Sequence, residues 1–123
     1  MVGALFDSNI LIDHLNAVPQ AREELARFDD RAISIITWME VMVGAVAEQA
    51  ESTRHFLNGF TVIALGDVIA DRAVILRRAH RVKLPDAIIW ATAQVTGRLL
   101  VTRNTKDFPP GDPGIRREPY VLC

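Results

Sequence analysis

The sequence predicts an α/β domain of three layers, in which helices cover both faces of a parallel sheet. Short apolar runs alternate along the chain with longer stretches whose apolar residues recur every three or four positions. The apolar runs lack polar alternation, which is typical of strands that are buried on both faces. The length of 123 residues and the 50% hydrophobic content suit one core, so we expect residues 1–123 to form a single domain.

The first half of the chain alternates between the two patterns. An apolar run stops at Asp7, and Leu11, Ile12 and Leu15 then recur at helical spacing. Pro19 starts the next helix, because proline fits the first turn of a helix. The expected elements are a strand at 2–6, helices around 11–15 and at 19–28, a strand at 32–36, helices at 37–50 and 52–58, and a strand at 60–65.

The second half continues the alternation. Gly66 and Asp67 open a helix that ends in several cations, which are favourable beside the negative end of the helix dipole. Its expected apolar face consists of Ile69, Ala73, Leu76 and Ala79. Another helix runs from Leu84 to Gly97, and a strand follows at 99–102. We expect a loop rich in proline and glycine over 103–118 and a short last strand at 120–122.

Composition and charge limit the classes of protein. The net charge of −1 argues against a protein that coats nucleic acid by bulk electrostatics. However, residues 1–65 hold four Arg and nine acidic residues, whereas residues 66–123 hold ten Lys or Arg and six acidic residues. This asymmetry leaves room for an acidic site that faces a basic rim. The lone Cys123 permits no internal disulfide, and no signal peptide or membrane-length apolar run is present, so we expect a cytoplasmic protein.

Four acidic residues follow strands or begin helices, where the ligands of an open parallel sheet collect. They are Asp7, Glu40, Asp86 and Asp107. Each also has a simpler interpretation: Asp7 caps the helix behind it, Thr37 and Glu40 form a capping box, Asp86 fills the first turn of a helix, and Asp107 forms a turn.

Taken together, the four acids indicate a metal site, because gathered carboxylates repel one another unless a cation neutralises them. Oxygen ligands without His or Cys suit Mg²⁺ or Mn²⁺, and His14, His55 and His80 show no zinc spacing. A carboxylate-bound divalent ion is the usual apparatus for phosphodiester cleavage. The basic rim that would offset repulsion of a polyanion comprises Arg77, Arg78, Arg81, Lys83, Arg103 and Lys106. Alternatively, these cations are solvated charges at helix ends.

Four segments, in order and over nearly the whole chain, resemble the PIN-domain ribonucleases, and most nearly the VapC toxins of toxin–antitoxin pairs. The segments are Asp7-Ser8-Asn9, Thr37-x-x-Glu40 with Gly44 following, Leu84-Pro85-Asp86-Ala87-Ile88-Ile89-Trp90-Ala91-Thr92-Ala93, and Thr102-Arg103-Asn104-Thr105-Lys106-Asp107-Phe108. Ser8 stands where many members have Thr, but both residues offer a hydroxyl group.

The resemblance implies a three-layer α/β/α PIN-like fold with strand order 3-2-1-4-5. It implies that the catalytic, metal-binding quartet is Asp7, Glu40, Asp86 and Asp107. Asp7 and Asp86 would be the principal ligands, and the other two would bind directly or through water. The side chains implied to orient ligands or substrate are Asn9, Thr37, Thr102 and Asn104.

The implied activity is that of an endoribonuclease toxin that depends on Mg²⁺ or Mn²⁺ and hydrolyses RNA. The resemblance also implies a homodimer and a VapB-type antitoxin, with contacts to DNA only through the antitoxin. Exposed apolar residues of the early helices are candidates for the antitoxin groove or the dimer interface. They are Leu11, Leu15, Trp38, Met42 and Val43.

Three alternatives remain open at this point. A haloacid-dehalogenase-like phosphatase also places an Asp after its first strand, but it needs a second Asp where this chain has Asn9. A catalytically silent PIN-like module that binds RNA or a partner would not need the complete quartet. In a purely structural α/β domain, all four acids would act as caps.

Overall fold

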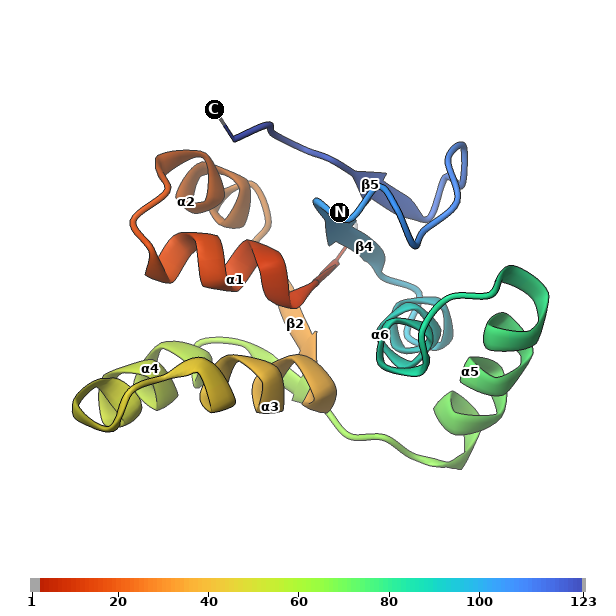
Figure 1. The fold of residues 1–123 in the computed structure, drawn as a ribbon, viewed down its shortest axis with the longest axis horizontal. Helices are drawn as coiled ribbons and strands as arrows, with labels where there is room; N and C mark the ends of the chain where they lie inside the picture. Colours follow the sequence, from red (N-terminus) through yellow and green to blue (C-terminus); the bar gives the residue numbers. More distant parts are fainter. Residues whose placement is uncertain (1–2, 123) are drawn as a thin grey trace.

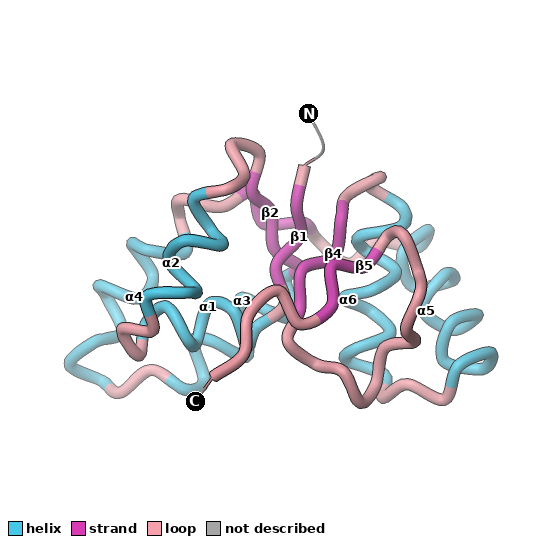
Figure 2. The backbone as a smooth tube through the Cα atoms, turned by 90° about the horizontal axis from the view of Figure 1, so that it is seen from above, coloured by secondary structure: helices cyan, strands magenta, loops and turns pink. Residues whose placement is uncertain are grey.

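The computed structural model describes residues 3–122, in which a five-stranded sheet lies between two groups of helices (Figures 1 and 2). The strand order is β3-β2-β1-β4-β5 and every pairing is parallel, which confirms the expected order and the three-layer architecture. The strands are β1 (Ala4–Phe6), β2 (Arg31–Ser34), β3 (Thr61–Ile63), β4 (Leu99–Thr102) and β5 (Ile115–Arg117).

Helices α1 to α4 lie on one side of the sheet, and α5 and α6 lie on the other (Figure 2). The helices are α1 (Ser8–Leu15), α2 (Pro19–Ala26), α3 (Ile35–Gly44), the 3₁₀ turn η1 (Ala47–Gln49), α4 (Ala50–Leu57), α5 (Asp67–His80) and α6 (Leu84–Val95). Within the described residues, no helix is long and apolar enough to span a membrane.

The pleat of the strands divides the core into two clusters, because successive side chains point to opposite faces. In β1, Ala4 and Phe6 join the cluster beneath α1 to α4, whereas Leu5 joins the cluster beneath α5 and α6. In the neighbouring β4, Val101 joins the cluster beneath α1 to α4, and Leu100 joins the cluster beneath α5 and α6. Strand β1 is therefore apolar along its whole length and β4 is apolar up to Thr102, as the lack of polar alternation predicted.

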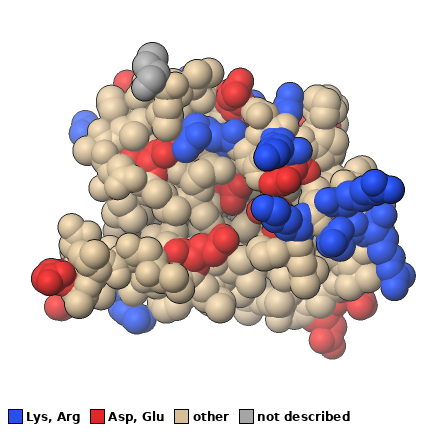
Figure 3. Space-filling view, viewed as in Figure 1, with Lys and Arg blue, Asp and Glu red and all other residues tan. Residues whose placement is uncertain are grey.

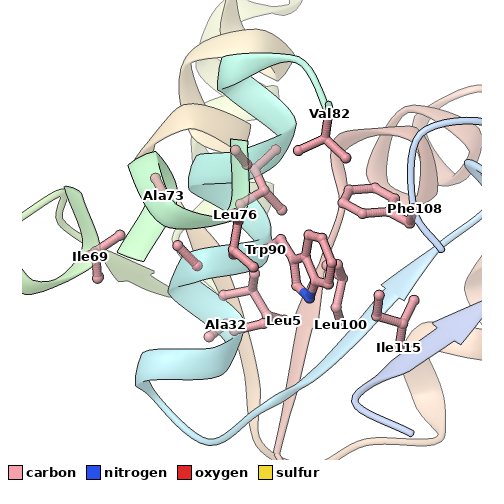
Figure 4. Close-up of a cluster of buried hydrophobic side chains, with 14 residues drawn as sticks. Leu5, Ala32, Ile69, Ala73, Leu76, Val82, Trp90, Leu100, Phe108 and Ile115 are labelled. Carbon is pink, nitrogen blue, oxygen red and sulfur yellow. The ribbon is translucent and has the colours of Figure 1, made fainter. Parts of the chain in front are cut away.

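Helix α6 is the most deeply buried helix of the second cluster (Figure 4). Trp90 is 2% exposed and packs edge-on against Phe108, with 5.9 Å between the ring centroids. Helix α5 covers α6 through Ile69 and Leu76, while Ala79 is exposed and does not belong to that face, contrary to expectation. This packing fixes the first turn of α6, and with it Asp86, at the carboxyl edge of the sheet.

The strand expected at 32–36 is present but ends two residues earlier than expected, and the capping box expected at Thr37 and Glu40 is wrong. The second strand ends at Ser34, whose side chain caps α3 by accepting a hydrogen bond from the Ile36 backbone N–H at 3.1 Å. Serine in extended conformation is a strong N-cap, and it begins the helix two residues before Thr37.

Two other boundaries differ from expectation. The helix expected at 37–50 breaks after Gly44, where the backbone of Ala45 is extended, and α4 begins at Ala50 rather than at Ser52. The last strand, β5, lies inside the expected loop and pairs with β4 through Ile115, whereas residues 120–122 form no strand. Val2, at the start of the first expected strand, and Cys123 lie outside the described residues.

Candidate functional site

The site begins where β1 and β4 end side by side, at the point where the strand order reverses. The backbone N–H of Asp7 donates to the Val101 carbonyl at 2.9 Å, which extends the pairing by one residue. Thr102, at the end of β4, donates from Oγ1 to Asp7 Oδ2 at 2.7 Å. The two strand exits are thus joined through a carboxylate that is only 4% exposed.

Asp7 is also the N-cap of α1, because its Oδ1 accepts a hydrogen bond from the Ser8 backbone N–H at 2.7 Å. The capping interpretation is therefore correct, but it accounts for only one of the two carboxylate oxygens. Asn9 Nδ2 lies 3.3 Å from both Asp7 Oδ2 and Thr102 Oγ1, so it supports the second oxygen.

The loop after β4 is organised by Asn104. Its Nδ2 donates to Asp107 Oδ2 at 2.9 Å, while its Oδ1 accepts from the backbone N–H groups of Lys106 and Asp107 at 3.0 Å. The Asn104 backbone N–H donates to Thr102 Oγ1 at 3.0 Å. Asp107 is therefore held by the same short segment that supports Asp7.

Glu40 reaches the site from α3 rather than serving as a helix cap. Its Oε1 accepts a hydrogen bond from Ser8 Oγ at 2.5 Å, which joins α3 to the start of α1. As a residue, Glu40 is exposed. Thr37 is completely buried one turn earlier, and no partner for its hydroxyl is found among the described residues. The structure therefore does not join Thr37 to the acids through a hydrogen bond.

The acids are close enough to perturb one another. Burial raises the pKa of Asp7, hydrogen bonds from Thr102 and Ser8 oppose that rise, and the charges of Glu40 and Asp107 add to it. Burial also raises the pKa of Asp86 to about 6, with further contributions from the charges of the other three acids and from a hydrogen bond with Asp107. All four predicted acids thus share one electrostatic environment.

The donor set fits a hard divalent cation. Its side chains present oxygens only, and a nearby positive charge would favour the ionised forms of Asp7 and Asp86, whose pKa values are raised mainly by burial and further by the neighbouring acids. Within residues 3–122, no three His, Cys, Asp or Glu side chains stand in the close arrangement of an assembled metal site. The hydrogen bonds to Ser8 and Asn104 help to hold Glu40 and Asp107 in their present positions.

Much of the expected basic rim lies beside this acidic cluster. Arg77, Arg78, Arg81 and Lys83 are exposed at the end of α5 and in the turn before α6. Figure 3 shows cations gathered on this part of the surface. Among the described residues these four form no ion pair.

Arg103 was expected in the basic rim, but its guanidinium is not free. It forms two hydrogen bonds with Asp13, whose side chain is 8% exposed. Sequence reasoning missed Asp13, which falls four residues after Asn9 and therefore on the same face of α1. An acid in a helix whose other buried residues are Ser8, Ile10 and Leu11 was the available signal.

Comparison with known proteins supports the same interpretation. The PIN domain family matches residues 4–109. Ribonuclease VapC10 of Mycobacterium tuberculosis is 38% identical, over 85% of this chain and 85% of the relative.

Solved structures agree with this match. A toxin–antitoxin complex from Klebsiella pneumoniae contains a chain that is 49% identical, with a TM-score of 0.92 over 98% of this chain and 100% of that one. A DNA-bound VapBC complex from Salmonella typhimurium gives a TM-score of 0.75 at 26% identity, over 96% of this chain and 98% of that one. The chain belongs to the PIN domain family, in the group of the VapC ribonucleases.

Proposed function

We propose that this chain is an endoribonuclease toxin that requires Mg²⁺ or Mn²⁺ and is neutralised by a VapB-type antitoxin. The observation that carries the proposal is the mutual electrostatic influence of four carboxylates around the β1–β4 switch point, with Asp7 buried and the pKa values of Asp7 and Asp86 raised. In a structural domain whose acids served only as helix caps, bringing the acids close together would destabilise the fold by charge repulsion without any compensating function.

Asp7 and Asp86 would be the principal metal ligands, and Asp107 and Glu40 would bind directly or through water. When bound, such an ion lowers the pKa of its water and stabilises the charge that builds on the scissile phosphate. Thr102 and Asn9 orient Asp7, Asn104 orients Asp107, and Ser8 orients Glu40. Thr37 contributes a buried hydroxyl that is available to a ligand or a water.

RNA is the substrate class that the surroundings favour. The cations of α5 lie just before Asp86 in the chain, and they would attract a phosphate backbone that the acids alone would repel. Their placement on one side of the site favours a single strand or loop that runs across the end of α5 toward the four acids.

The antitoxin is inferred from two relatives, a toxin–antitoxin complex from Klebsiella pneumoniae and a DNA-bound VapBC complex from Salmonella typhimurium. A hollow of about 330 Å³ between α1 and the α3–α4 region is lined by apolar side chains such as Ile12 and Leu15 and by polar ones such as Asn16 and Thr53, and is suited to an amphipathic segment of such a partner. Contact with DNA would be made by the antitoxin only.

Leu11 was expected in the groove or dimer interface, and this expectation is wrong because Leu11 is completely buried. Leu15 and Val43 are 42% and 86% exposed and remain candidates. Val43 belongs to a second apolar patch with Met39 and Leu84, which would serve a homodimer. We place this single PIN domain in the cytoplasm, where RNA substrates are present.

The test is cleavage of a structured RNA by the purified chain. We expect cleavage with Mg²⁺ or Mn²⁺ and none with EDTA or in Asp86→Asn. The matched control is Asp67→Asn, which neutralises an exposed acid in the first turn of α5 and should cut as fast as the parent. RNA binding without cleavage by the parent would favour the catalytically silent module instead.

A further inference from the structure

A second cluster of charged and polar groups lies on α1 one helical turn beyond Asn9 of the candidate site. Asp13 is 6% exposed, and both of its carboxylate oxygens accept from the Arg103 guanidinium, at 2.5 and 2.9 Å. The Tyr120 hydroxyl donates to the same carboxylate at 2.7 Å, and the guanidinium lies 6.0 Å from the centroid of the Tyr120 ring. This cluster joins α1, the loop after β4 and the C-terminal segment.

The cluster is connected to Asp7 through Asn9. The backbone N–H of Arg103 donates to Asn9 Oδ1 at 3.1 Å, and Asn9 Nδ2 donates to Asp7 Oδ2. Arg103 is therefore attached to α1 at two points one turn apart, by its side chain at Asp13 and by its backbone at Asn9.

The orientation of the Asn9 amide depends on this attachment. As long as the Arg103 N–H occupies Oδ1, the NH₂ group faces Asp7, as an acceptor-only carboxylate requires. If the loop moved away, the amide would lose the contact that anchors its Oδ1 end, and the Asn9 side chain could rotate so that its NH₂ group leaves Asp7. The same loop carries Asn104, which holds Asp107.

We propose that Asp13, Arg103 and Tyr120 are positioning residues that hold the loop after β4 on α1 and thereby set the orientation of Asp7 and Asp107. This proposal rests on the proposed function, since it concerns the same four acids. It gives Arg103 a role different from the one expected of it in the basic rim, because its guanidinium is occupied by Asp13.

The chain provides a matched control in a second buried ion pair. Glu24 on α2 is 3% exposed, and both of its oxygens accept from the Nε and Nη2 atoms of Arg116 on β5. This pair also joins an early helix to the C-terminal segment by a two-point guanidinium contact. Among the described residues, neither of its side chains is hydrogen-bonded to Asp7, Asn9, Asn104 or Asp107.

The experiment compares Arg103→Lys with Arg116→Lys in the full chain. Each variant keeps the charge but loses the planar two-point contact. We expect both to unfold at a lower temperature than the parent. Only Arg103→Lys should weaken Mn²⁺ binding, measured by titration calorimetry without RNA, and only this variant should lower kcat. Each effect should be about 10-fold or more, because loss of a group that orients metal ligands has effects of that size. Arg116→Lys should stay within about 2-fold in both.

Tyr120→Phe is the milder test, since it keeps the ring and removes only the hydrogen bond to Asp13. It should fold, lower kcat more than it raises KM, and weaken Mn²⁺ binding by a smaller factor than Arg103→Lys. Equal Mn²⁺ affinity in the parent, Arg103→Lys and Tyr120→Phe would overturn the positioning role while leaving the proposed function intact. A parent chain that neither binds Mn²⁺ nor cleaves RNA would overturn both.

Discussion

Replacing Asp86 by Asn should make the metal-free protein more stable, although it removes a residue that we propose as a metal ligand for cleavage. The folded environment raises the pKa of Asp86 from 3.8 to about 6, first through burial and then through the charges of Asp7, Asp107 and Glu40. A carboxyl whose pKa is raised on folding binds its proton more tightly in the folded state. It therefore stabilises the fold below about pH 4, and that stability is lost as the pH rises through about 6.

The size of the effect follows from the pKa shift. A rise of about two units corresponds to about 3 kcal/mol at neutral pH, which screening of this half-buried group reduces to roughly 1–2 kcal/mol. Asn forfeits the favourable interaction of an anion with the N-terminus of α6, worth about 0.3–1 kcal/mol. The net gain is about 1 kcal/mol, or a rise of about 3–5 °C in Tm for a chain of this length.

The assay is thermal unfolding in EDTA at several pH values, with Asp67→Asn as the control. Asp67 is an exposed acid in the first turn of α5, so its loss should lower Tm slightly or leave it unchanged. The Asp86→Asn advantage should be present at pH 7 and should shrink toward pH 4. Added Mg²⁺ should stabilise the parent and not the variant. An Asp86→Asn protein that unfolds below the parent at pH 7, with the same pH dependence, would refute the reasoning.

Three further predictions concern the cap, the core and the basic rim. Ser34→Ala should lower the free energy of unfolding by about 1 kcal/mol in urea denaturation, because the α3 cap is lost, and an unchanged midpoint would contradict the assignment of Ser34 as the cap. Leu11→Ala should lower it by about 2–5 kcal/mol in the same assay, since the side chain is completely buried; a loss below 1 kcal/mol would return Leu11 to the groove candidates. The double variant Arg77→Glu, Arg81→Glu should raise KM for RNA with little change in kcat, and it should make KM less dependent on salt concentration. Arg22→Glu, on the exposed surface of α2, should change neither KM nor its salt dependence.

The parallel three-layer architecture and the acidic cluster could be anticipated from the chain because both follow from local patterns, whereas the strand order was implied only by the resemblance to PIN domains. Uninterrupted apolar runs indicate strands buried on both faces, and residues that follow such strands must meet at one edge of a parallel sheet. The convergence of Asp7, Thr102 and Asp107 needed no more than that.

The features that were missed depend on tertiary contacts. Ser34 follows Ile33 in what looks like a continuing apolar run. Only the structure shows that the β2–β3 pairing ends at Ser34, which pairs with Ile63 and then caps α3. The three residues of β5 are too few to form a pattern, and they are a strand because Ile115 pairs with Leu100. The contact between Asp13 and Arg103 spans 90 positions, and its partners look like ordinary surface charges in the sequence.

Metal-dependent cleavage by the purified chain tests the central claim most directly. RNA is incubated with the parent and with Asp7→Asn, each in Mg²⁺ and each in EDTA, after both proteins have been shown to be folded. Because Asp7 lies at the centre of the acidic cluster, we predict cleavage only by the parent in Mg²⁺. Cleavage by Asp7→Asn at the parent's rate, or by the parent in EDTA, would contradict the account.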